Sequence, residues 1–155
     1  MSIAVAANNG QSPCSNITVP NKPDTVSLAD NINRAERSKW LIFAAPRLSW
    51  FYSQTRSGGP WDYKLQGRSL DDLGNYHPSP YVDFGNFNFG MTGGAAGIEL
   101  QVLLRGAGAY QKYVTHNSRP EWGGPTDLHG PYGDDPADQA EIIAGFNYYK
   151  YGCYK

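Results

Sequence analysis

The chain has 155 residues and a mass of 17.0 kDa, the size of one domain that buries a core without help from metal ions. Its residues are 40% hydrophobic and 14% aromatic, which excludes an intrinsically disordered chain. The 13 Lys and Arg residues and 14 Asp and Glu residues leave a formal net charge of −1, so composition gives no general attraction for nucleic acid. No stretch is long and apolar enough to span a bilayer, and we expect no membrane insertion.

The first 26 residues predict an extended N-terminal arm, because they are rich in Asn, Ser and Gly, contain prolines and show no periodicity. Residues 27–155 are expected to form the domain itself. The start of the chain lacks the basic residues and the long apolar stretch of a secretory signal peptide. We therefore expect any secretion to use a specialised route rather than a general signal.

The two cysteines, Cys14 and Cys153, lie at opposite ends of the chain and match no zinc-binding spacing. The termini of compact domains often lie close together, so a disulfide between the two cysteines is geometrically reasonable. The alternative is two free thiols in a reducing cytoplasm. A bridge would indicate that the protein works in an oxidising compartment.

The first helices are predicted on either side of a proline. Ser27-Leu-Ala-Asp30 resembles a capping box, and apolar residues at helical spacing predict a helix over 27–45. Pro46 is suited to the first turn of a second helical piece that ends near Arg56. A Ser-Gly-Gly-Pro break follows at 57–60.

Turn-forming residues predict two long loops, over 61–83 with at most short strands and over 115–133. Between them we expect a glycine-rich helix over 86–97, packed tightly on a neighbour, and a strongly periodic core helix over 99–114. Asp134-Asp135-Pro136 predicts the start of a last helix over 136–150. The expected fold is a single, mainly α domain of four or five helices with two long Gly/Pro-rich loops, and an α+β fold is the alternative.

Long loops inside a compact domain are often functional, so the candidate site residues are sought there. The sequence has no P-loop, nucleophile elbow, zinc-protease or dinucleotide-binding motif, and we expect no cofactor and no metal site. The candidate catalytic residues are Asp62, Lys64, Asp83, Asp134 and Asp135, and the candidate substrate-binding residues are Asn86, Trp61, Tyr81, Tyr132, His129 and Asp138.

A pair of carboxyl groups held at different pKa values is the minimum for acid–base hydrolysis of a glycosidic bond. Asp62 or Asp83 could pair with Asp134 or Asp135, although one of the last two is expected simply to cap the final helix. Lys64 follows Asp62 by two residues on a segment expected to be extended, so their side chains would point the same way. That arrangement suits either a surface ion pair or a lysine that stabilises an anionic transition state.

The remaining candidates also have simpler explanations. Asn86 could satisfy loop backbone groups, and His129 could be solvated rather than act as a general base. Trp61, Tyr81 and Tyr132 could pack within the fold or stack on sugar rings. The sequence leaves these alternatives open.

Four ordered blocks carry a family resemblance: Gly59-Pro-Trp-Asp-Tyr-Lys64, the Asp83–Gly97 stretch, Leu103-Leu-Arg-Gly-Ala-Gly108, and Gly130-Pro-Tyr-Gly-Asp-Asp-Pro-Ala-Asp-Gln139. Over about residues 24–150 the chain resembles the polymorphic toxin type 44 family. The resemblance implies a toxin domain used against competing bacteria, usually the C-terminal part of a larger secreted protein. It also implies a secretion-system carrier and a cognate immunity protein. The blocks contain Asp62, Lys64, Asp83, Asn86, Asp134, Asp135 and Asp138, whose roles do not follow from the resemblance.

Three functions remain for such a toxin. The first, which we favour, is a periplasmic hydrolase of the peptidoglycan glycan strand, with one Asp as the protonated acid and a second carboxylate or Asn86 positioning water or sugar. The second is a metal-independent ribonuclease in the target cytoplasm that uses Lys64, an Asp and His129. The net charge disfavours the ribonuclease, although a basic patch over residues 34–47 could compensate. The third is a non-enzymatic binding or inhibitory module.

Overall fold

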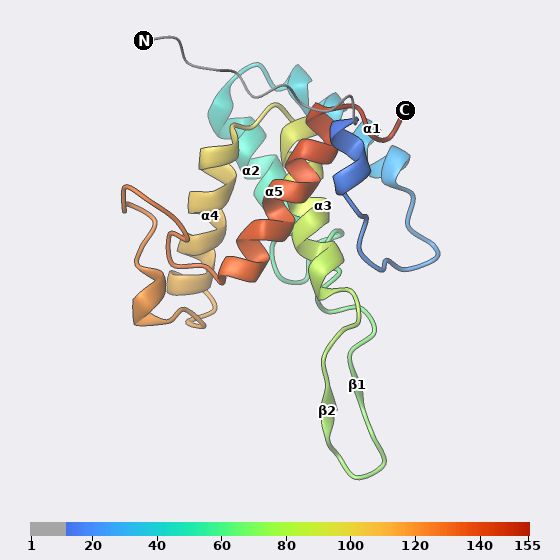
Figure 1. The fold of residues 1–155 in the computed structure, drawn as a ribbon, viewed down its shortest axis with the longest axis vertical. Coiled ribbons are helices and arrows are strands. Elements are labelled where there is room, and N and C mark those ends of the chain that lie inside the picture. The colour runs from blue at the N-terminus through green and yellow to red at the C-terminus, as the bar shows by residue number, and fades with distance from the viewer. Residues whose placement is uncertain (1–11) are drawn as a thin grey trace.

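The computed structural model describes residues 12–155, which form five α-helices and one small hairpin (Figure 1). Residues 1–11, which begin the predicted N-terminal arm, lie outside the described residues. The helices are α1 (Leu28–Arg37), α2 (Ala44–Thr55), α3 (Val82–Ala95), α4 (Leu100–Tyr113) and α5 (Pro136–Lys150), and the strands are β1 (Ser69–Leu70) and β2 (Tyr76–His77). The mainly α fold predicted from the sequence is confirmed.

Helices α3 and α5 lie side by side at the centre of the fold (Figure 1). Their backbones touch where each helix has a glycine. A Cβ atom on Gly90 would collide with the carbonyl of Ile142, and one on Gly145 would collide with the carbonyl of Phe87. The predicted glycine-rich helix is therefore confirmed, although it begins earlier than expected, at Val82. Its apolar side chains Phe84, Phe87 and Met91 are fully buried.

The predicted single helix over 27–45 is wrong. Helix α1 starts as expected, with the Ser27 hydroxyl accepting a hydrogen bond from the backbone N–H of Asp30 at 3.2 Å. It ends at Arg37, and a 3₁₀ turn (Ser38–Trp40) leads to α2, which has Pro46 in its first turn. A continuous helix would press the ring of Pro46 against the carbonyl of the residue four positions before it, so the chain must break upstream of the proline.

The other predicted segments are confirmed. Helices α4 and α5 occupy the expected ranges, and α4 contributes Leu103 and Leu104 to the core. The first long loop contains the antiparallel hairpin β1–β2, and the second contains a 3₁₀ turn (Pro120–Trp122). Arg105 of α4 donates hydrogen bonds from Nη1 to the carbonyl oxygens of Pro125 and Asp127 at 2.6 and 2.8 Å, which fixes the second loop to the helix.

A disulfide joins Cys14 to Cys153, so the alternative of two free thiols is wrong. The bridge ties a 3₁₀ turn of the N-terminal arm (Pro13–Asn16) to the segment after α5, across 139 positions of sequence. Ile17, Val19 and Val26 of the arm pack against the core. The described part of the arm is therefore held to the body at both ends.

Candidate functional site

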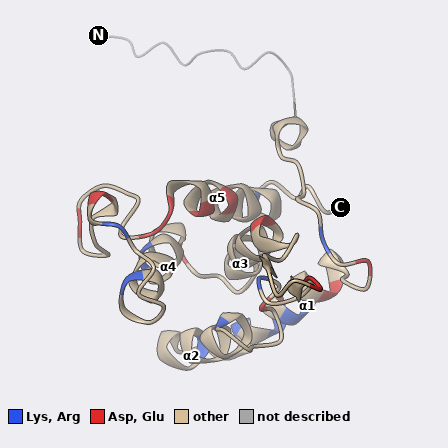
Figure 2. Ribbon diagram, turned by 90° about the horizontal axis from the view of Figure 1, so that it is seen from below, with Lys and Arg blue, Asp and Glu red and all other residues tan. Residues whose placement is uncertain are grey.

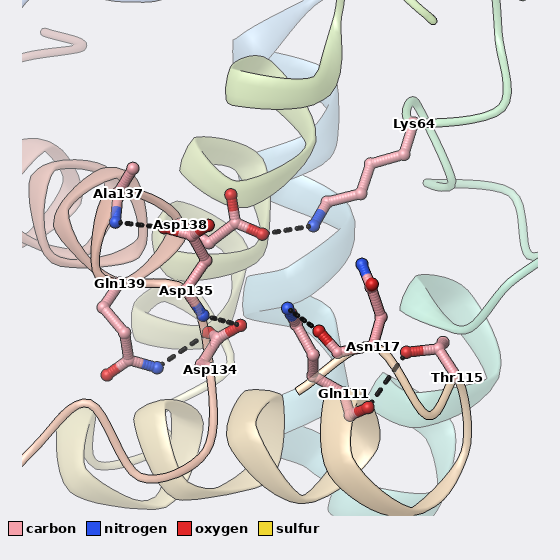
Figure 3. Close-up of polar contacts among 9 residues, drawn as sticks. All are labelled: Lys64, Gln111, Thr115, Asn117, Asp134, Asp135, Ala137, Asp138 and Gln139. Carbon is pink, nitrogen blue, oxygen red and sulfur yellow. Dashed lines mark hydrogen bonds and ion pairs between the residues drawn. The ribbon is translucent and has the colours of Figure 1, made fainter. Parts of the chain in front are cut away.

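A cavity of about 800 Å³ is lined by α2, α3, α4, the start of α5 and the segment that follows α2. Much of its wall is apolar and includes Leu48 and Phe51 of α2, Phe89 of α3 and Val102 of α4. Polar side chains also line it, and Figure 3 shows five of them: Lys64, Gln111, Asn117, Asp134 and Asp138. Asn86 belongs to the same lining.

Asp134 is the most deeply buried acid of the cavity, with 2% of its surface exposed. Its Oδ1 accepts a hydrogen bond from the backbone N–H of Asp135 at 3.0 Å, and its Oδ2 accepts one from Nε2 of Gln139 at 2.8 Å. Burial raises the pKa of Asp134 from 3.8 to about 6, the Gln139 hydrogen bond opposes that rise, and the charge of Asp138 adds to it. A carboxyl group with this pKa can carry a proton near neutral pH.

Lys64 and Asp138 form an ion pair with 3.2 Å between Nζ and Oδ2 (Figure 3). This replaces the predicted pairing of Lys64 with Asp62, because the segment forms turns rather than an extended strand. The Oδ2 of Asp62 instead accepts a hydrogen bond from the backbone N–H of Gly58 at 2.8 Å. The stem of Lys64 packs on Gly85 of α3, where a Cβ atom would stand 2.9 Å from Cγ of the lysine.

Asn86 lines the cavity from α3 and is 4% exposed. Its Nδ2 is buried and has no hydrogen-bond partner among residues 12–155. A buried donor without a partner costs about 1–3 kcal/mol, so such a group is uncommon unless a ligand satisfies it. Asn86 is therefore suited to donate a hydrogen bond into the cavity.

Asp135 occupies the N-cap of α5, where its Oδ1 accepts a hydrogen bond from the backbone N–H of Ala137 at 2.8 Å. This confirms that one of the two adjacent acids caps the last helix. The ring of Tyr132 lies under the guanidinium of Arg105, 4.4 Å from its carbon, and His129 is exposed. Trp61 and Asp62 line the cavity, whereas Asp83, Asp135, Tyr81, Tyr132 and His129 lie outside its lining.

The sequence profile of the family described as Bacterial toxin 44 matches residues 50–151, more than half of the chain. The chain belongs to the bacterial toxin 44 family. No curated protein and no solved structure gives a significant match. The segment matched by the toxin profile includes every polar residue named above for the cavity.

Three further polar residues of the toxin domain line the cavity and were missed by the sequence analysis. Gln111 donates a hydrogen bond from Nε2 to the carbonyl of Asn117 at 3.2 Å, and Thr115 donates one to the carbonyl of Gln111 at 3.1 Å. Figure 3 places them across from Asp134, Asp138 and Lys64. Nothing in the sequence marked these residues as functional. Gln111 is a polar residue of the periodic helix predicted over 99–114, and Thr115 and Asn117 begin an ordinary polar loop.

Within residues 12–155 of the toxin domain, no group of three or more His, Cys, Asp or Glu side chains is arranged to hold a metal ion. None of the described helices is long and apolar enough to cross a membrane. The cavity itself contains a buried acid, an ion pair and amide side chains.

Proposed function

We propose that this toxin domain hydrolyses the glycan strand of bacterial peptidoglycan, with Asp134 as its general acid. The observation that carries the proposal is the state of two acids in one cavity. Asp134 is buried with a pKa raised to about 6, while Asp138 is paired as a carboxylate with Lys64. Glycosidases use two carboxyl groups in this way, one protonated and one ionised.

In the proposed reaction, Asp134 gives its proton to the glycosidic oxygen as the bond to the anomeric carbon breaks. Asp138 takes a proton from the water molecule that adds to that carbon, and Lys64 holds the Asp138 carboxylate in place. The free Nδ2 of Asn86 donates a hydrogen bond to a hydroxyl or acetamido oxygen of the sugar. The two carboxyl groups then exchange protons with solvent for the next cycle.

The charge of the cavity supports a sugar substrate rather than a polyanion. Its cationic lining residues are Arg56, Lys64 and Arg68, and its acids are Asp62, Asp138 and the protonated Asp134, so the cavity carries an excess of no more than one positive charge. A site that follows an RNA backbone would need a larger cationic excess, because each nucleotide brings a negative charge. The ribonuclease alternative also used His129, which lies outside the cavity lining, so we place it second.

The disulfide between Cys14 and Cys153 supports action in the periplasm of the target cell, because disulfides persist in oxidising compartments. Membership of a toxin family implies an immunity partner. We propose that a cognate immunity protein protects the periplasm of the producing cell, and that a specialised secretion system exports the toxin with a carrier.

The decisive experiment incubates the purified protein with peptidoglycan sacculi and measures new reducing sugar ends and the masses of the fragments. Wild type should release reducing ends, and Asp134→Asn should lower the rate by about 100-fold or more, the usual effect of losing a general acid. Asp135→Asn is the matched control, because asparagine caps a helix as well as aspartate does. Release of free amino groups without reducing ends would contradict the proposal.

A growth assay tests the compartment. Bacteria that express the chain with a periplasmic export signal should round up or lyse, and cells that express it without the signal should grow normally. Asp134→Asn should abolish the killing. Killing from the cytoplasm with degraded RNA would overturn the proposal in favour of the ribonuclease.

A further inference from the structure

Four consecutive large apolar residues lie at the surface where the chain breaks between α1 and α2. Trp40 is 87% exposed, Ile42 82% and Phe43 73%, and Leu41 between them is 37% exposed. We call residues 40–43 the apolar tip. Water-exposed apolar groups in a continuous run are uncommon in proteins that act alone, so this run needs an explanation.

The apolar tip is held in a defined conformation. Arg47 of α2 donates hydrogen bonds from Nε and Nη2 to the carbonyl oxygen of Leu41, at 3.2 and 3.1 Å. On the other side, the Ser38 hydroxyl donates to the carbonyl of Ala35 at 2.7 Å. The apolar side chains are therefore presented outward by a structure that is fixed at both ends.

Cationic residues flank the apolar tip. Arg37 and Lys39 directly precede it and are exposed, and Arg47 contacts it through the Leu41 carbonyl. Arg34, earlier on α1, is exposed with its guanidinium over the ring of Trp61, and Nζ of Lys39 lies 3.4 Å from the Tyr149 hydroxyl. Glu36 is the one acidic residue between positions 34 and 56, and its Oε1 accepts a hydrogen bond from the Tyr149 hydroxyl at 2.7 Å. In Figure 2 the Lys and Arg segments of α1 and α2 lie toward the same side of the fold.

Two other exposed apolar residues have the opposite surroundings. Leu73 and Leu128 are each 87% exposed, as Trp40 is. Leu73 follows Asp71 and Asp72 in the hairpin, and Leu128 follows Asp127 in the second long loop. These two leucines therefore lie beside acids, whereas the apolar tip lies beside cations.

We propose that the apolar tip docks onto an anionic phospholipid surface. Tryptophan and phenylalanine prefer the boundary between lipid headgroups and acyl chains, and flanking lysine and arginine side chains bind the phosphates. Each such cation near an anionic membrane contributes about 1 kcal/mol. The proposal concerns a surface away from the acids of the cavity and does not depend on the bond that the toxin cleaves.

The features of the apolar tip favour lipid over the other possible partners. A stable protein interface needs about 800 Å² on each partner, which is a broad surface, whereas a bilayer accepts a narrow projecting tip. Residues 1–11 of this chain contain no charged side chain, so they offer nothing to pair with the cations. An anionic bilayer matches both the apolar and the cationic groups.

Docking would also position the cavity. Helix α2 begins directly after the apolar tip, and its later residues Phe51, Tyr52 and Thr55 line the cavity. A helix of 12 residues is about 18 Å long. The cavity would therefore lie within about one helix length of the lipid, where it would meet material attached to the membrane.

The test is co-sedimentation of the oxidised, full-length protein with vesicles of phosphatidylglycerol and phosphatidylethanolamine, at low salt. The protein should bind these vesicles and not vesicles of phosphatidylcholine alone. The triple substitution Trp40→Ser, Ile42→Ser and Phe43→Ser should weaken binding at least tenfold. Arg37→Gln with Lys39→Gln should weaken it by about tenfold, and 0.5 M salt, roughly three times the physiological ionic strength, should do the same.

The matched control is the double substitution Leu73→Ser and Leu128→Ser, which removes equally exposed apolar residues beside acids and should leave vesicle binding unchanged. Circular dichroism should show every variant folded, because the substituted side chains are exposed. Equal binding by the wild type and the triple variant, or no binding to anionic vesicles at low salt, would overturn the proposal. Loss of binding to an immunity protein without any vesicle binding would assign the apolar tip to a protein partner instead.

Discussion

Asp134 and Asp135 are adjacent in the chain, but only Asp134 lines the cavity, because the carboxylate of Asp135 is bound to the first turn of α5. The backbone N–H of Asp135 in turn donates to Oδ1 of Asp134 at 3.0 Å. The capping residue therefore also orients the buried acid. Two neighbouring carboxyl groups thus have different environments, which makes them a natural pair for substitution.

The stability of the protein should depend on pH through Asp134. Its folded-state pKa of about 6 exceeds its ordinary value of 3.8, so the folded state holds the proton more tightly. The resulting stabilisation is complete below pH 3.8 and is lost as pH rises through about 6. By linkage it amounts to about 3 kcal/mol. Denaturant unfolding measures the difference in the free energy of unfolding between wild type and Asp134→Asn. That difference should shift by about this amount in favour of the variant as the pH rises. A constant difference would contradict the buried acid.

Two substitutions should move the pKa of Asp134 in opposite directions. Lys64→Gln should raise it, because a cation that favours the ionised carboxyl is removed, and Asp138→Asn should lower it, because a nearby negative charge is removed. Carbon-13 NMR of the aspartate carboxyl groups measures both shifts. Asp72→Asn in the exposed hairpin is the control and should change nothing. Shifts of the same sign would show that the three residues do not interact as described.

Asn86→Leu should separate function from stability. The substitution removes a buried donor that has no partner among the described residues, so the free energy of unfolding should stay level or rise by about 1 kcal/mol. Cleavage of peptidoglycan should fall if the amide binds substrate. The control for stability is Asn88→Leu, also on α3 and in the cavity lining. Asn88 has an unpaired buried Nδ2 as well, but its Oδ1 accepts a hydrogen bond from Asn31 Nδ2 at 2.9 Å, so its loss should destabilise by about 1–3 kcal/mol. Equal destabilisation by both would give Asn86 a purely structural role.

Gly90→Ala should destabilise the fold by about 3 kcal/mol, because the added methyl group meets the backbone of Ile142 and forces α3 and α5 apart. Gly106→Ala in α4 is the matched control, since an added Cβ there meets nothing within 4 Å. It should stabilise the helix by about 0.5–1 kcal/mol. Thermal unfolding of both variants checks the pair, and similar melting temperatures would contradict the close helix contact.

Reduction of the disulfide should lower stability. The bridge closes a loop across 139 positions, and the loss of its constraint on the unfolded chain is worth up to about 5 kcal/mol. The melting temperature of wild type should fall with a reductant, while that of the Cys14→Ser, Cys153→Ser variant should be low and unaffected by reductant. Unfolded, unreduced wild type should contain no thiol that reacts with a labelling reagent.

The sequence predicted those parts of the fold that depend on local rules. The apolar spacing in 100–113 and the cap and proline at 135–136 define α4 and α5 from within their own residues. Local rules failed over 27–45, where periodicity favoured one helix although Pro46 required a break upstream of it. That error concealed the apolar tip, because residues 40–43 were placed inside a continuous helix.

The sequence also identified the candidate acids, together with Lys64 and Asn86. They were found because polar side chains in long loops and at helix starts are candidates for function. Their partners were not found. Lys64 pairs with an acid 74 positions away, and Gln111 lies opposite Asp134 only because α4 packs beside the start of α5. The raised pKa of Asp134 likewise comes from its burial. Sequence alone thus determined the helices, the loops and the residue types available for chemistry. The tertiary structure alone decided which of them meet, because distances between remote segments and exclusion of water depend on packing.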